Sequence, residues 1–199
     1  DGNHCFLVDV LSVRHFEGLK QLMEDPSRTL IFHACAEDLE VLEHGLNIIP
    51  DTIFDTQIAA GIANVGYSMG YARLVQRLFD IELDKQETRS DWLARPLTDR
   101  QIEYAAYDVA YLHSMYNVLS GMLSDQGRQH WFEEESLAVY TLVSDRKNTQ
   151  DYHRKLKGAW KLSSEALTAL KRLCDWRELT ARALDKPRSH VVKEIGRAS

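Results

Sequence analysis

The sequence has 199 residues, of which 44% are hydrophobic, and this length suits one compact domain with a smaller attachment. No apolar run approaches the length of a membrane span, and residues 1–4 lack the features of a signal peptide, so we expect a soluble cytoplasmic protein. Cys5, Cys35 and Cys174 are widely spaced, which favours three reduced thiols over a disulfide framework. The pair His33 and Cys35 is weak evidence for zinc, and no zinc site is assigned.

The charge is distributed unevenly along the chain. The net charge is −6, from 24 basic and 30 acidic residues. Residues 151–199 contain 12 basic and 6 acidic residues, a net +6, which leaves −12 for residues 1–150. An acidic body with a basic tail suits a metal-dependent enzyme that acts on a polyanion. A solvated tail without a partner would have the same composition.

Strands and helices are predicted to alternate over the first 79 residues, which is typical of an α/β domain. The expected elements are a buried strand at 5–10, a helix at 16–23, a strand at 29–34, a helix at 37–44 closed by Gly45, a strand that passes into a helix at 53–60 and a helix at 70–79. Asp38 falls just after the second of these strands, at the end of a parallel strand where ligands of open α/β sheets gather. From the residues alone, the favoured alternative is that Glu37 and Asp38 complement the positive end of the helix dipole.

A polar connection follows at residues 83–96, and connections of this length in compact domains are often functional. Lys85, Arg89 and Arg95 could contact phosphates, and Trp92 could stack on a base. A Trp92 that packs on the core and holds the connection in place is at least as well supported.

A helix is predicted to begin at Thr98, because Gln101 lies at the three-residue offset of a capping box. One continuous apolar stripe is expected along it, made of Ile102, Ala105, Ala106, Val109, Leu112, Tyr116, Leu119 and Leu123, beside a second row of Tyr104, Asp108, Tyr111 and Met115.

Tyr104 and Asp108 are one helical turn apart, which places a phenol and a carboxylate on one side of the helix. A carboxylate can hold a hard divalent cation, and a hydroxyl beside it can orient a metal-bound water. Together they would form half of a phosphodiester-cleaving site. A solvated Asp beside a half-buried Tyr is the alternative.

The segment from His33 to Leu112 resembles the 3′-to-5′ exonuclease domain of the bacterial ribonuclease D family, in the DEDD exonuclease superfamily. Residues 33–42 resemble the second exonuclease motif, whose acidic residue falls on Asp38. Residues 104–108 resemble the tyrosine-bearing third motif, with its tyrosine at Tyr104 and its acid at Asp108. The connecting segments 54–57, 83–85 and 90–98 are similar to the same family.

The resemblance implies a ribonuclease H-like α/β exonuclease domain at residues 1–140, a linker at 141–157 and a small all-α module at 158–199. That module is similar to the opening helices of the helicase-and-RNase-D C-terminal (HRDC) domain, and both domains are expected to be incomplete. Within the module, Leu162, Ala166, Leu170, Leu173, Trp176 and Leu179 form an apolar stripe, so Trp176 is predicted to belong to its core. The family's first motif, a strand with Asp-x-Glu, is expected before Asp1. The 199-residue chain alone is therefore expected to have little or no activity.

The implied activity is two-metal hydrolysis at an RNA 3′ end with release of nucleoside 5′-monophosphates, and tRNA precursors are the expected substrates. With Mg²⁺ or Mn²⁺, Asp108 would ligate the first ion, Asp38 would support the second directly or through water, and Tyr104 would hydrogen-bond the attacking water. His33 and Asp55 are assigned supporting roles. Two rival functions remain, a DNA-directed exonuclease of the same superfamily and a non-catalytic RNA-binding protein.

Overall fold

The computed structural model describes residues 4–48, 50, 52–83, 90–145, 153, 156, 158–184, 186 and 191–192. The chain divides into two compact units, residues 1–144 and 145–199. Within the described ranges, every helix is too short or too polar to cross a membrane.

The sheet of the first unit carries the segments that matter for function. Strands β1 (Leu30–Phe32) and β2 (Ile53–Asp55) pair in parallel, with their last residues opposite each other. Helix α2 (Ala36–Leu46) follows β1, and α3 (Thr56–Ile62) follows β2. Because the strands are parallel, both strand-to-helix junctions lie at the same edge of the sheet. Polar side chains at the two junctions are therefore brought together.

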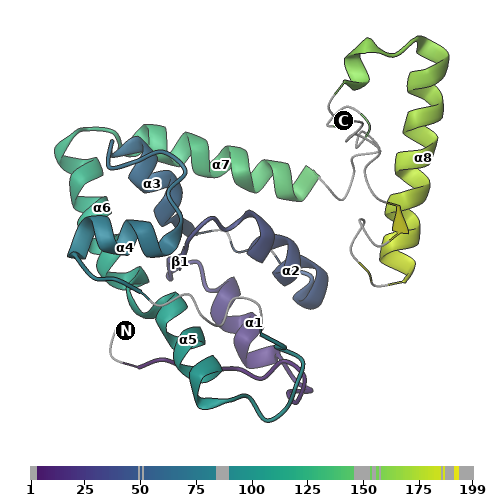
Figure 1. Ribbon diagram of the computed structural model, residues 1–199. Helices are drawn as coiled ribbons and strands as arrows, with labels where there is room; N and C mark the ends of the chain where they lie inside the picture. Colours follow the sequence, from purple (N-terminus) through teal and green to yellow (C-terminus); the bar gives the residue numbers. More distant parts are fainter. Residues whose placement is uncertain are drawn as a thin grey trace. The chain divides into compact units, whose positions relative to one another are not determined.

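The other helices surround this sheet or form the second unit (Figure 1). The first unit contains α1 (Glu17–Glu24), α4 (Tyr71–Phe79), α5 (Asp99–Ala110), α6 (Leu112–Asp125) and α7 (Gln129–Asp145), and the second contains the short η2 (Ala159–Lys161) and α8 (Ser164–Ala183). Helix α6 packs against α3 and against β1.

The core of the first unit joins β2 to α3, α4, α6 and α7. The Phe54 ring lies 4.8 Å from the ring of Tyr116 and 4.7 Å from that of Phe132. Leu74 and Leu119 are fully buried in the same cluster. Burial of each such side chain stabilises the fold by about 1.5–3 kcal/mol. This core fixes the positions of β2, which ends at Asp55, and of α6.

The helices predicted at 16–23 and 70–79 are confirmed, as is the strand that passes into a helix at residue 56. The prediction that Gly45 closes the second helix is wrong. Helix α2 continues to Leu46, and Asn47 ends it in the left-handed region at φ 54°, with its N–H donated to the Glu43 carbonyl. Asparagine tolerates this conformation, so the helix has no need of the glycine.

The strand predicted at residues 5–10 is also wrong. Residues 4–9 are irregular, and Phe6 is 84% exposed. A strand forms only where a neighbouring strand supplies hydrogen bonds, and in the described part of the chain β1 and β2 pair only with each other. Asp9 instead makes a turn, because its carboxylate accepts hydrogen bonds from the Ser12 hydroxyl and the Leu11 N–H.

The continuous apolar stripe predicted after Thr98 is wrong as well, although the helix start is confirmed. Two helices, α5 and α6, meet at Tyr111, whose φ of −101° and ψ of −2° depart from helical values. Ile102 and Val109 in α5 are exposed, whereas Met115, from the predicted second row, is fully buried in α6. Leu119 and Leu123 of the predicted stripe are buried in α6 as expected, so the prediction fails only for its part on α5.

The apolar stripe predicted on α8 does not form the buried face of this helix. Trp176 is 51% exposed, and Leu173 and Leu179 are exposed beside it. The buried residues are instead Cys174, Glu178 and Ala181. Glu178 accepts a hydrogen bond from Arg182 at 3.1 Å, and this ion pair offsets the cost of burying a carboxylate.

Candidate active site

The carboxylate of Asp55 joins the two strand-to-helix junctions. Asp55 is 2% exposed and accepts four backbone N–H groups. Two come from the start of its own helix, Gln57 at 2.7 Å and Ile58 at 3.3 Å. The other two come from the junction after β1, Ala34 at 3.0 Å and Cys35 at 2.8 Å. A single buried side chain thus caps α3 and fixes the segment that enters α2.

The hydrogen bonds from Ala34 and Cys35 to Asp55 help to position Asp38. Ala34 has a φ of 58°, a left-handed conformation that costs free energy for a residue with a Cβ. The hydrogen bond to Asp55 holds it there, and the chain then turns into α2 with Asp38 in the first helical turn. Partial burial raises the pKa of Asp38, and the charges of Glu37 and Asp55 raise it further. A cation beside Asp38 would stabilise the ionised carboxylate and so oppose this rise in pKa.

His33 is held in the neutral form by its surroundings. The Thr56 hydroxyl donates its one hydrogen to the Phe32 carbonyl at 2.9 Å. The His33 Nδ1, 2.9 Å from the same oxygen, must therefore be the donor in that contact. Burial lowers the pKa of His33, with a partial offset from Asp55. A neutral imidazole with Nδ1 protonated connects the two junctions a second time.

Burial and the neighbouring Asp55 raise the pKa of the Cys35 thiol. The thiol therefore stays protonated at neutral pH, which suits a packing residue at the start of α2. Cys5, Cys35 and Cys174 are all free thiols.

Tyr104 and Asp108 lie one turn apart on α5, as predicted. Partial burial raises the pKa of Asp108. The Tyr104 ring lies 5.9 Å from the half-buried ring of Trp92. Trp92 therefore contacts the ring of Tyr104.

The segment before α5 is tied to the start of that helix by Gln101. The capping box is complete, because the Gln101 carboxamide oxygen accepts the Thr98 N–H at 2.9 Å and the Thr98 hydroxyl accepts the Gln101 N–H. The buried Gln101 amide also donates to the Asp91 carbonyl at 3.0 Å and to Ser90 at 3.2 Å. The sequence indicated the cap but not this second function.

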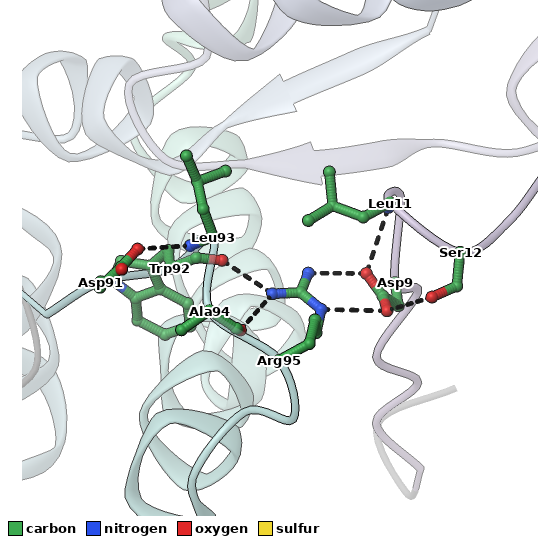
Figure 2. A network of polar contacts seen from close by, with 8 residues as sticks. All are labelled: Asp9, Leu11, Ser12, Asp91, Trp92, Leu93, Ala94 and Arg95. Carbon is green, nitrogen blue, oxygen red and sulfur yellow. Dashed lines mark hydrogen bonds and ion pairs between the residues drawn. The ribbon is translucent and has the colours of Figure 1, made fainter.

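Arg95 makes four hydrogen bonds to protein groups. Figure 2 shows its guanidinium between the Asp9 carboxylate and the carbonyls of Trp92 and Ala94. It donates to Asp9 through two nitrogens, at 2.6 and 3.1 Å, and to the two carbonyls at 2.8 and 2.9 Å. The pair lowers the pKa of Asp9 and raises that of Arg95. These contacts make Arg95 a brace between distant segments, so its suggested phosphate contact is not part of our proposal. Lys85 and Arg89, suggested with it, lie outside the described residues.

Tyr71 connects the regions of the two motifs, and no pattern in the sequence indicated this role. Its ring packs edge-on against His33, with 5.6 Å between centroids. Its hydroxyl donates to the Tyr107 carbonyl at 2.8 Å and accepts the Tyr111 N–H at 3.1 Å, on either side of Asp108. Burial raises the pKa of Tyr71 to about 12, so the phenol keeps its proton at physiological pH.

The donor chemistry of Asp38 and Asp108 suits a hard divalent cation, because both are solvent-accessible carboxylates with raised pKa values. Over the described ranges, however, no three His, Cys, Asp or Glu side chains gather closely enough to hold a metal. Asp38 and Asp108 would have to be joined by further ligands to hold such an ion.

Comparisons with known proteins identify the family of this chain. Residues 1–124 match the family described as 3′-5′ exonuclease. Ribonuclease D of Pseudomonas paraeruginosa is 41% identical over 98% of this chain and 51% of its own length. Ribonuclease D of Escherichia coli is 37% identical over 98% of this chain and 52% of its own length.

Solved structures of nucleases are also similar to this chain. The crystal structure of Escherichia coli RNase D, described as an exoribonuclease involved in structured RNA processing, matches 98% of this chain and 52% of its own, with a TM-score of 0.82 and 37% identity. Brucella melitensis NrnC with bound Mg²⁺ matches 70% of this chain and 66% of its own, with a TM-score of 0.58 and 31% identity. The chain spans about half the length of the curated relatives it matches. It belongs to the 3′-5′ exonuclease family, and proteins named ribonuclease D are its homologues.

Proposed function

We propose that the full-length gene product is a metal-dependent 3′-to-5′ exoribonuclease that releases nucleoside 5′-monophosphates, with tRNA precursors among its substrates. The observation that carries this proposal is the match to Escherichia coli RNase D along nearly the whole chain, at a TM-score of 0.82. Such an enzyme acts in the cytoplasm, where its RNA substrates are. Selection for a free 3′ end and for the sugar 2′-hydroxyl would favour single-stranded RNA.

Asp108 and Asp38 are proposed to hold the divalent ions, Mg²⁺ or Mn²⁺, two in each site. Bound there, such ions would activate water and neutralise charge on the scissile phosphate. The Tyr104 hydroxyl would orient the attacking water by a hydrogen bond, since it lies one turn from Asp108. Asp55 and His33 support the site by fixing the segment that enters α2. The carboxylates thus come from α2 and α5.

We propose the domain limits 1–140, 141–157 and 158–199 for the exonuclease domain, the linker and an HRDC-like module. Helix α8 has a regular start, because the Ser163 hydroxyl accepts the Ala166 N–H at 3.3 Å. The positive balance of residues 151–199 supports a role in holding RNA. An exposed Trp160 beside Lys161 adds aromatic surface to that module.

The proposal is tested with the full-length gene product and 5′-labelled single-stranded RNA. With Mg²⁺ we expect products that shorten one nucleotide at a time from the 3′ end and nucleoside 5′-monophosphates in solution. An RNA that ends in a 3′-phosphate is the matched control and should resist, because its 3′ terminus is blocked. Internal cleavage, or equal degradation of the blocked RNA, would contradict the proposal.

The same assay distinguishes the two alternative functions. A DNA oligonucleotide of identical sequence tests for a DNA-directed exonuclease, which would degrade it at least as fast as the RNA. An RNA-binding protein without catalysis would retain the RNA on a filter and leave it intact at every Mg²⁺ and Mn²⁺ concentration.

The 199-residue chain by itself is expected to hydrolyse RNA weakly or not at all. Two protein carboxylates compensate little of the charge of two divalent ions, so the ions would bind weakly and in poor positions. The measurement compares nucleotide release by this chain and by the full-length gene product at equal concentration. Robust Mg²⁺-dependent release by the 199-residue chain would show that the catalytic set has been misplaced.

Removal of residues 151–199 from the full-length gene product is expected to weaken RNA binding more than it slows turnover at saturating RNA. This segment has a net charge of +6 and none of the proposed metal ligands. The slope of log Kd against log salt should become shallower by roughly 0.7 for each phosphate of a single strand that the protein no longer neutralises. A milder variant is Lys171→Gln with Arg172→Gln on α8. Unchanged affinity and slope after the deletion would make this segment a structural attachment.

A further inference from the structure

Helices α5 and α6 follow each other along the chain and are separated by Tyr111 alone. In an uninterrupted helix the Tyr111 N–H donates to the Tyr107 carbonyl four residues earlier. Here the Tyr71 hydroxyl stands between these two groups, because it donates to the carbonyl at 2.8 Å and accepts the N–H at 3.1 Å. The same N–H also reaches the Val109 carbonyl. Insertion of a side chain into the hydrogen-bond ladder is a recognised cause of a helix kink.

The burial pattern supports a real change of direction at this point. Beyond the break, Met115 and Leu119 are fully buried, so α6 is fixed in the core. Before the break, Ile102 and Val109 are exposed although they continue the apolar stripe of α6. The direction in which α5 leaves the core is therefore set in the turn that contains Asp108.

Tyr71 also contacts the segment that leads to Asp38. Its ring packs on His33, and the two residues after His33 are those held by the Asp55 carboxylate before α2 begins. One side chain from α4 thus touches both of the segments that carry the proposed metal ligands.

We propose that Tyr71 is a positioning residue of the exonuclease site, whose hydroxyl maintains the break between α5 and α6 and thereby the placement of Asp108 relative to Asp38. This inference rests on the proposed function for its catalytic consequence, but its structural part does not. A tyrosine that only stabilised the fold would affect unfolding and leave metal dependence unchanged.

The test uses Tyr71→Phe in the full-length gene product, which keeps the ring on His33 and removes the hydroxyl. We expect kcat to fall about 10- to 100-fold and the metal concentration for half-maximal rate to rise by a similar factor, with little change in KM for RNA. Tyr67→Phe is the matched control, because Tyr67 is 94% exposed, and it should behave as wild type. A folded Tyr71→Phe with kcat and metal dependence within about twofold of wild type would overturn the proposal.

Crystal structures of wild type and Tyr71→Phe provide a readout that needs no activity. We expect the Tyr111 nitrogen and the Tyr107 oxygen to change their separation and Asp108 to shift with them, whereas an unchanged break would overturn the proposal. If Tyr71→Phe does not fold, amide hydrogen exchange of the wild-type protein tests whether the Tyr111 N–H is hydrogen-bonded. The Tyr111 amide should be protected, and exchange at the rate of a free peptide would overturn the proposal. An inactive wild type would refute the proposed function and leave these structural readouts intact.

Discussion

Asp108→Asn is expected to lower RNA hydrolysis by the full-length gene product about a thousandfold, equivalent to about 4 kcal/mol of transition-state stabilisation. The substitution keeps the size of the side chain and removes a negative ligand from α5. Partial burial raises the pKa of Asp108, so the folded state holds its proton more tightly than the unfolded chain does. The ionised side chain therefore lowers stability above its unfolded pKa, and the variant should melt at or above the wild-type temperature at pH 7 without metal. Single-turnover rates and thermal melts measure both effects.

Two further variants of the same helix separate function from structure. Asp99→Asn is the matched control, since Asp99 is an exposed residue of the first turn, and it should retain the wild-type rate. Tyr104→Phe keeps the ring beside Trp92 and should bind metal normally while turnover falls steeply. If Tyr104→Phe kept the wild-type rate and Asp108→Asn only lowered the melting temperature, the pair would be structural.

Asp55→Asn is expected to destabilise the first unit by about 3 kcal/mol, the largest effect on stability that we predict. The buried carboxylate accepts four N–H groups, and an amide would place its own N–H₂ against some of these donors. Asp80→Asn is the control, because Asp80 is exposed and asparagine suits its left-handed backbone at φ 58°. Midpoints of urea denaturation report the difference.

The same variant should also lose activity before it unfolds, because Asp55 fixes the segment that enters α2 and carries Asp38 into place. A wild-type denaturation midpoint for Asp55→Asn would show that water replaces the carboxylate at little cost. Asp55 would then not be the group that joins the two junctions.

Features set by neighbouring residues were predictable from the sequence. The start of α5 follows from Thr98 and Gln101, which satisfy each other's backbone groups within one turn. The spacing of Tyr104 and Asp108 likewise depends only on the helical period. The β1 and β2 strands were found because each is a short apolar run that leads directly into a helix.

Features set by distant residues were not predictable. The break at Tyr111 is caused by a hydroxyl 40 positions earlier, so the helical period alone predicted one continuous stripe. Arg95 was suggested as a phosphate contact, and no local pattern shows its partner Asp9, which is 86 positions away. The four donors to Asp55 come from two segments about 20 positions apart, and no local pattern records that they meet.

The most direct measurement is a crystal structure of the full-length gene product with Mn²⁺ and an RNA 3′ end, in which anomalous scattering locates the metal. We predict two peaks about 4 Å apart, with the Asp108 carboxylate coordinated to one and the Asp38 carboxylate to the other or to its water. Metal peaks that avoid both α2 and α5, at Mn²⁺ concentrations that support hydrolysis, would contradict the assignment of these aspartates.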